Sequence, residues 1–318
     1  MEKEKKEALQ KKSAVWKVHL TSLIVLLYSQ FMSITADPKS IKALAFDLDG
    51  TLLTPGSVLS KRSLDALEKC RQRGLQIIIA TGRTINSAEP FRKEIRAEGP
   101  MIFLNGAVVA DMDRGGIIKT TYMDKEAAEF CVDLAREMGV YCQLYIESSD
   151  NVPGGKTTRI TLFAERDLPE RKFYHEKTGV LAELTNLNEV LNHPGFGNVI
   201  KTMFLVEPEL QAVIRPILDK HIGESVYIVQ TYRSYLEILS KDASKGKALA
   251  YVMESLSLRP HEVIAFGDEE NDIPMFETAA YSAAPSSAKE SVKARAGMVI
   301  GSNADDGVAE FLERFFGF

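Results

Sequence analysis

The architecture of this 318-residue chain can be read from one stretch, IKALAFDLDGT at residues 41–51. Its first six residues are apolar except for Lys42, as expected for a buried strand of a parallel sheet. Asp47 and Asp49 follow at the end of that strand, and residues two apart on an extended chain point to the same side. Gly50 then provides a turn. Because ligands bind at the carboxyl edge of open α/β sheets, the stretch predicts two acids at a binding site.

A metal ion is the second expectation from these acids. Two carboxylates this close repel each other unless a cation lies between them. Oxygen ligands suit a hard divalent ion, so the sequence predicts Mg²⁺. A further apolar run at residues 263–266 ends in Gly267 and Asp268, which we expect to complete the metal site. Asp272 would be a direct or water-mediated ligand.

Composition narrows the class of protein. The chain is 45% hydrophobic and 26% charged, which is ordinary for a globular protein. A net charge of -5 and the lack of a basic stripe argue against a nucleic-acid binder. The three cysteines and five histidines follow no metal-ligand spacing, so neither a disulfide framework nor a zinc site is expected.

Residues 1–40 form an N-terminal extension before this pattern. Residues 1–12 are rich in Lys and Glu, and residues 18–36 are uncharged and mostly apolar. This arrangement fits a signal anchor or a weak signal peptide, and Met32 is an alternative start. Unpaired cysteines favour a reducing compartment, so we predict a cytoplasmic protein. The alternative is membrane attachment, or export, through residues 18–36.

Strand-like and helix-like segments alternate beyond residue 40, which predicts an α/β fold with a Rossmann-like parallel sheet. Its strands are expected at residues 43–47, 76–80, 101–104, 263–266 and 298–300, and its helices at 60–73, 86–98, 245–256 and 306–316. The alternating pattern is interrupted between about residues 117 and 233. There we expect helices at 125–138 and 209–221, strands at 141–146, 198–206 and 226–231, and a loop at 150–155. We therefore expect a core of residues 41–117 and 234–318 with an inserted α+β domain at 118–233.

The polar groups after the predicted strands fit phosphoryl transfer through an aspartyl intermediate. Asp47 would be the nucleophile. Asp49 would protonate the leaving alcohol and then activate the water that hydrolyses the aspartyl phosphate. Thr81 and the backbone N–H groups of Thr81 and Gly82 would hold phosphate oxygens. Lys245, at a predicted helix start, could reach the same phosphate.

Several of these segments have structural explanations when they are taken singly. Thr81-Gly82-Arg83 is most typical of a β-turn at a strand exit. Lys245 would by default be a solvated helix residue, and only the other motifs single it out. Asn105-Gly106 is most often just a turn, so a substrate-side role for Asn105 is the less favoured interpretation.

In combination, the ordered motifs Asp-Leu-Asp-Gly-Thr, Ala-Thr-Gly-Arg, Ser-Lys-Gly and Gly-Asp-Glu-Glu-Asn-Asp resemble those of the haloacid dehalogenase superfamily, specifically its Cof-type phosphatases with a C2B cap. The resemblance covers residues 41–318 and implies that the insertion is a cap that closes over the site and selects the substrate. It implies that Mg²⁺ is held by Asp47, the backbone carbonyl of Asp49, and Asp268. It also implies phosphate contacts from Thr81, Gly82, Lys245 and Asn271. The apolar N-terminal extension and the segment 283–288 depart from the family pattern.

The sequence therefore predicts a Mg²⁺-dependent phosphatase of small phosphorylated metabolites, with sugar phosphates favoured and pyridoxal phosphate as a further candidate. A phosphomutase on the same scaffold is the nearest alternative. A non-enzymatic aspartyl-phosphate receiver module is the alternative from another class, and a membrane-tethered scaffold that uses residues 18–36 is the third.

Overall fold

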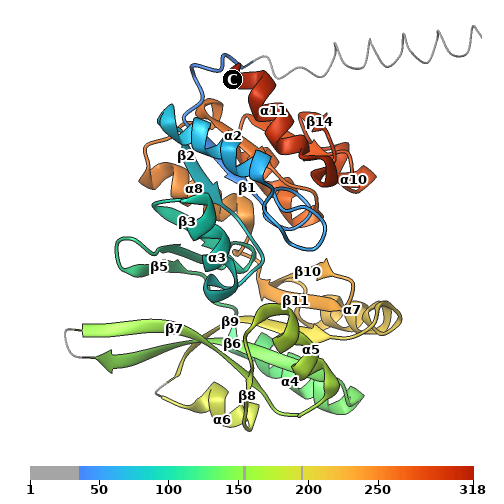
Figure 1. The fold of residues 1–318 in the computed structure, drawn as a ribbon. Helices are drawn as coiled ribbons and strands as arrows, with labels where there is room; N and C mark the ends of the chain where they lie inside the picture. The colour runs from blue at the N-terminus through green and yellow to red at the C-terminus, as the bar shows by residue number, and fades with distance from the viewer. Residues whose placement is uncertain (1–35, 153–154, 195) are drawn as a thin grey trace, which may run out of the picture.

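The computed structural model describes residues 36–152, 155–194 and 196–318 (Figure 1). The N-terminal extension was predicted at residues 1–40, and its residues 1–35 lie outside the described residues. They include all of the predicted apolar stretch, 18–36, except Ala36. Within the described ranges, no helix combines the length and the apolar character needed to cross a membrane.

The core is a five-stranded parallel sheet with β1 (Ala43–Phe46) near its centre. The strand order is β14-β13-β12-β1-β2, with the other strands at β2 (Gln76–Ile79), β12 (Val263–Phe266), β13 (Tyr281–Pro285) and β14 (Met298–Ile300). The predicted α/β class with a parallel sheet is thus confirmed. Strand β1 pairs with β2 on one side and with β12 on the other, so the strand order reverses at β1. Open α/β sheets bind their ligands at such a point, beyond the carboxyl ends of the strands.

Helices cover both faces of this sheet. Leu44 and Phe46 pack into one hydrophobic cluster with residues of α2 (Lys61–Gln72) and α11 (Gly307–Phe316). Ala45 points the other way, toward α8 (Lys245–Ser255) and α9 (Ile273–Thr278). The remaining helices of this part are α3 (Ile85–Ile95), α10 (Glu290–Lys293) and the short 3₁₀ helices η2 (Pro260–Glu262), η3 (Glu270–Asp272) and η4 (Asn303–Asp305).

A small antiparallel sheet extends the core beyond β2. It contains β3 (Pro100–Phe103), β4 (Val108–Asp111) and β5 (Gly116–Thr120), and a bridge between Ala80 and Ile102 joins it to the parallel sheet. The turn η1 (Leu104–Gly106) connects β3 to β4, with Asn105 at φ 56° and ψ 29°. Strand β3 and the turn were predicted from the sequence, whereas β4 and β5 were not.

The inserted domain is a six-stranded sheet with helices, which we call the cap. Its strand order is β10-β11-β9-β6-β7-β8, at β6 (Tyr141–Val152), β7 (Gly155–Ala164), β8 (Glu183–Leu184), β9 (Phe196–Leu205), β10 (Val226–Tyr232) and β11 (Tyr235–Ser240). Its helices are α4 (Lys125–Met138), α5 (Pro169–Thr178), α6 (Leu187–Asn192) and α7 (Pro208–Ile222). Strand β6 continues well beyond the predicted 141–146, and most of the predicted loop at 150–155 is strand.

The two faces of the cap sheet have different neighbours. Helices α4 and α7 share one hydrophobic cluster with residues such as Leu144 and Ile238. Tyr145 and Leu239, on the opposite face, belong to the cluster of the core, and Figure 1 shows this face turned toward the core. The cap sheet and its helices span residues 125–240, compared with the predicted 118–233. The difference arises because β11 pairs with β9, whereas β5 pairs with β4.

Candidate active site

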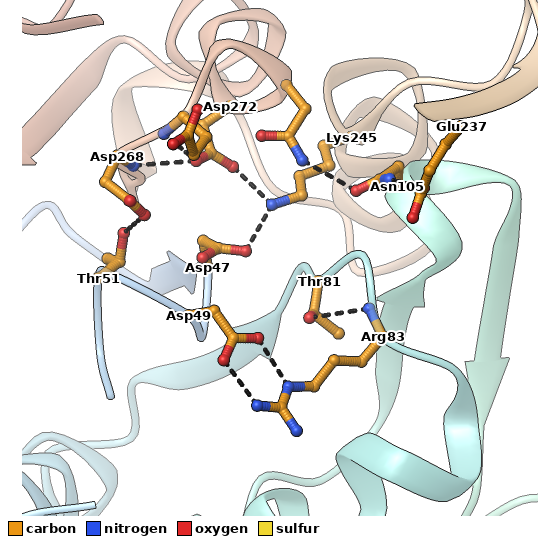
Figure 2. Close-up of polar contacts among 12 residues, drawn as sticks. Asp47, Asp49, Thr51, Thr81, Arg83, Asn105, Glu237, Lys245, Asp268 and Asp272 are labelled. Carbon is orange, nitrogen blue, oxygen red and sulfur yellow. Dashed lines mark hydrogen bonds and ion pairs between the residues drawn. The ribbon is translucent and has the colours of Figure 1, made fainter. Parts of the chain in front are cut away.

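Three carboxylates meet at the carboxyl edge of the parallel sheet. Asp47 follows β1, Asp268 follows β12 by two residues, and Asp272 ends η3. One oxygen of each lies within 4.8 Å of the others. Asp47 is 6% exposed and Asp272 is fully buried. The structure therefore brings together the two strand ends at which the sequence predicted acids (Figure 2).

Lys245 connects two of these acids. It is the first residue of α8, and the Ser244 hydroxyl caps the helix by accepting the N–H of Lys247 at 3.1 Å. The Lys245 Nζ donates to Asp47 Oδ1 at 2.5 Å and to Asp272 Oδ1 at 2.6 Å. Burial lowers the pKa of Lys245, but Asp272 and Asp47 outweigh that effect, so its pKa is raised overall. The ammonium group thus stays charged in the interior.

Short contacts hold Asp268 and Asp272 in place. Asp272 Oδ2 accepts the N–H groups of Asp268 and Glu269 at 2.9 and 3.0 Å. The Thr51 hydroxyl donates to Asp268 Oδ1 at 2.7 Å. Gly50 has φ +82°, and a Cβ there would lie 2.2 Å from Asp268 Oδ2. Only glycine therefore fits this turn.

The acids carry more negative charge than Lys245 neutralises. Burial raises the pKa of Asp47 well above its usual value, with Lys245 opposing the shift and Asp272 adding to it. Burial, with the nearby Asp272, raises the pKa of Asp268 to about 7. A divalent cation would balance this charge, and the all-oxygen donor set fits Mg²⁺. Both oxygens of Asp272 already accept hydrogen bonds, so Asp47 and Asp268 are the better candidates for direct contact with the ion.

The side chain of Asp49 lies apart from the three-acid cluster. Arg83 donates from Nε and Nη2 to its two oxygens at 2.7 and 2.6 Å. The same guanidinium donates to Ser57 Oγ at 3.1 Å and lies over the ring of Phe91, with 4.7 Å to the ring centroid. The Asp49 side chain is half exposed. Arg83 was not among the site residues predicted from the sequence, although its position directly after Thr81-Gly82 was a usable signal.

The predicted phosphate loop follows β2. Thr81 is 1% exposed, and its hydroxyl accepts the N–H of Arg83 at 3.2 Å. A Cβ on Gly82 would lie 2.8 Å from Asn105 Oδ1. Glycine is therefore needed for the loop to lie against the buried Asn105 amide.

A buried hydrogen-bond chain runs from the core into the cap. Asn271 Nδ2 donates to Asn105 Oδ1 at 2.9 Å, and Asn105 Nδ2 donates to Glu237 Oε2 at 2.7 Å. Glu237 Oε1 accepts from Thr231 Oγ1 at 2.9 Å and pairs with Lys201 Nζ at 3.1 Å. Burial lowers the pKa of Lys201, and Glu237 opposes that shift. The sequence carried no local signal for Glu237 or Lys201, because neither lies in a motif.

A cavity of about 420 Å³ lies between core and cap. Core residues that line it include Asp47, Asp49, Gly82, Arg83 and Asn271, and cap residues include Tyr174, Lys201, Tyr232, Tyr235 and Glu237. Of the other predicted site residues, Thr81 and Lys245 are each 1% exposed and Lys245 contacts Asp47 directly. On its core side, this cavity presents the Asp47 carboxylate, which contacts Lys245 and belongs to the three-acid cluster that could hold a metal ion. Its cap side presents tyrosines and the buried ion pair of Lys201 and Glu237.

The similarity of this chain to known proteins extends across both domains. A family model described as haloacid dehalogenase-like hydrolase matches residues 44–312. The chain is 30% identical over 280 residues to pyridoxal phosphate phosphatase YbhA of Escherichia coli K12, covering 85% of this chain and 97% of that protein. It is 26% identical over 286 residues to 5-amino-6-(5-phospho-D-ribitylamino)uracil phosphatase YwtE of Bacillus subtilis 168, covering 86% and 98%. The crystal structure of TM0651 from Thermotoga maritima is similar with a TM-score of 0.72 at 29% identity, covering 86% and 97%.

Proposed function

This chain belongs to the haloacid dehalogenase-like hydrolase family, and from that premise we propose that it is a Mg²⁺-dependent phosphatase of small phosphorylated metabolites. Its relatives include proteins named as phosphatases. The observation that carries the proposal is the position of Asp47, which lines the cavity while Lys245 holds one of its oxygens at 2.5 Å.

In the proposed reaction, an Asp47 oxygen forms a bond to phosphorus while the bond from phosphorus to the leaving oxygen breaks. Asp49 gives its proton to that leaving oxygen. It then takes a proton from the water that attacks the aspartyl phosphate, and this second step releases inorganic phosphate and restores Asp47. Arg83 donates one hydrogen bond to each Asp49 oxygen, so the proton that Asp49 transfers would be held on a lone pair that Arg83 leaves free.

The remaining site residues would bind and orient the phosphate. We assign this role to Thr81, Gly82, Lys245 and Asn271. Bound Mg²⁺ would offset the charge of the phosphate near Asp47 and would be held by Asp47, the backbone carbonyl of Asp49, and Asp268, with Asp272 direct or through water.

The cavity supports a small substrate. A volume of about 420 Å³ is within the range of small-molecule sites, and it accommodates a phosphate with a leaving group such as a monosaccharide or pyridoxal. Tyr174, Tyr232 and Tyr235 line its cap side and offer flat surfaces to a sugar or a heterocycle. The ring centroid of Tyr235 lies 5.8 Å from that of Tyr174 and 5.2 Å from that of Tyr232. We therefore propose sugar phosphates and pyridoxal phosphate as the first candidates. Three buried free thiols support a cytoplasmic location.

The test is phosphate release by the purified full chain with Mg²⁺, first from p-nitrophenyl phosphate and then from a panel of phosphorylated metabolites. Asp47→Asn should abolish turnover while circular dichroism and the melting temperature show a folded protein. Substantial residual activity in a clean preparation of this variant would refute the nucleophile assignment.

The same assay separates the alternatives. A phosphomutase would need a bisphosphate and would return the phosphoryl group to a sugar, so phosphate release without a bisphosphate argues against it. A receiver module would accumulate a long-lived phosphoenzyme without turnover. A scaffold protein would keep its partner binding in Asp47→Asn.

A further inference from the structure

The chain of hydrogen bonds from Asn271 through Asn105 to Glu237 has a defined direction. Glu237 pairs with Lys201 at 3.1 Å and is 3% exposed. As an ionised carboxylate, it can only accept hydrogen bonds. Asn105 must therefore turn Nδ2 toward Glu237, which turns its Oδ1 toward Asn271. Asn271 must in turn present Nδ2 to Asn105.

Within the described part of the chain, no contact other than that with Glu237 fixes the orientation of the two amides. Asn271 is 7% exposed, and its buried Oδ1 has no hydrogen-bond partner among the described residues. If both amides were reversed, the Asn271–Asn105 hydrogen bond would still form with its donor and acceptor exchanged. Among the residues that the structure describes, only the carboxylate of Glu237 disfavours the reversed arrangement.

The amides themselves are held firmly in place. Asn105 is fully buried in a left-handed conformation, at φ 56°, which asparagine and aspartate adopt more readily than most residues. Its Oδ1 lies so close to Gly82 that a Cβ there would be 2.8 Å away. Because Asn271 and Gly82 both line the cavity, the amide orientation decides whether a donor or an acceptor faces whatever is bound beside them.

We propose that Glu237 is a positioning residue for the phosphate site: through Asn105 it fixes the orientation of the Asn271 amide. This inference rests on the proposed function, in which Asn271 contacts the phosphate. Glu237 lies on cap strand β11, whereas both amides belong to the core. The amide orientation at the phosphate site is therefore set only while the cap occupies the position seen in the structure.

The test exchanges the carboxylate and the amide between two positions. In Glu237→Gln, Oε1 can still accept from Lys201 and Thr231, so Nε2 faces Asn105 and favours reversal of both amides. Asn105→Asp places a second carboxylate directly opposite that of Glu237. The double variant Glu237→Gln/Asn105→Asp has the net charge of the wild type. Its amide donor at position 237 and its carboxylate acceptor at position 105 restore the original orientation of Asn271.

Two measurements are made on each full-length variant: kcat and KM for p-nitrophenyl phosphate with Mg²⁺, and the rise in Tm caused by Mg²⁺ with inorganic phosphate. We expect each single variant to lose roughly 10-fold to 100-fold in kcat, the range for one hydrogen bond to a charged group. We expect the double variant to recover at least about tenfold over the poorer single variant. Glu165→Gln is the control, because it removes a cap ion pair with Arg136, at 2.7 Å, that does not line the cavity.

The inference is overturned if the double variant is no better than the poorer single variant, or if Glu165→Gln reduces kcat as much as Glu237→Gln. A wild-type protein that hydrolyses no aryl phosphate would refute the proposed function. In that case the phosphate-induced rise in Tm decides this inference. A rise that is lost in both single variants and regained in the double variant supports the inference, and any other pattern overturns it.

Discussion

Replacement of Lys245 by methionine tests the electrostatics of the acid cluster. Met matches the length and apolar stem of Lys but removes the ammonium that lies 2.5 Å from Asp47 and 2.6 Å from Asp272. The side chain is 1% exposed, so water cannot replace the lost charge without rearrangement. The variant therefore leaves two carboxylates buried beside Asp268 with no cation in the metal-free protein.

The expected loss is large for a single substitution. Removal of one partner from a buried ion pair costs about 3–5 kcal/mol of the free energy of unfolding. The loss should depend on pH, because burial already raises the pKa of Asp47 and removal of Lys245 raises it further. Between the unfolded and folded pKa values the folded protein then binds more protons than the unfolded chain, so stability falls as pH rises through that window. The destabilisation should be greater at pH 8 than at pH 5.

The assay is urea unfolding of the wild type and Lys245→Met at pH 5 and pH 8, in EDTA and in Mg²⁺. Lys247→Met is the matched control. Lys247 lies two residues further along α8, is 56% exposed, and pairs with Asp242 at 2.8 Å. Exposed ion pairs contribute little, so this control should change stability only slightly. Mg²⁺ should recover part of the Lys245→Met loss, since it would supply positive charge to the same acids.

One result would refute this reasoning. If Lys245→Met unfolds at the same urea concentration as Lys247→Met at pH 8 in EDTA, the acid cluster does not depend on the Lys245 ammonium. The pKa values of Asp47 and Lys245 would then not be coupled through their contact.

Three further predictions concern catalysis, metal binding and the thiols. Asp49→Asn should slow both chemical steps and let phosphoenzyme accumulate, which acid-quenched labelling would detect; an unchanged rate would remove Asp49 from acid–base catalysis. EDTA should abolish the activity and Mg²⁺ should restore it. Because the pKa of Asp268 is raised to about 7, the half-saturating Mg²⁺ concentration should rise about fivefold from pH 7 to pH 6, and a flat profile would contradict this. Burial raises the pKa of the Cys70 thiol to about 12, so roughly one thiol in ten thousand is ionised at pH 8 and a disulfide reagent should label Cys70 only after unfolding; rapid labelling of the native protein would disagree.

The core was predictable because its signals are local. Apolar runs such as residues 263–266 and amphipathic segments such as residues 125–138 specify a strand and a helix from their own periodicity. Parallel strands also place their carboxyl ends at one edge, so acids after two such strands are expected to meet. The observed cluster of Asp47, Asp268 and Asp272 follows from this geometry.

Pairing between distant segments was not predictable in the same way. The composition of strand β11 does not distinguish it from other short apolar segments. Its place in the cap depends on its register with β9, in which Glu237 lies opposite Met203. The strands β4 and β5 were missed for the same reason. Domain limits set by such pairings cannot be located from composition alone.

Local sequence was sufficient for the parallel α/β core and for the acids at its carboxyl edge, because burial and periodicity are properties of short segments. Tertiary structure alone determined that Lys245 is buried rather than solvated, that Asp49 pairs with Arg83, and that the cap contributes Glu237 to the core. Each of these depends on contacts across long stretches of chain, 132 residues in the case of Asn105 and Glu237. The energy of a buried charge depends on which groups surround it, and only the folded chain specifies those neighbours.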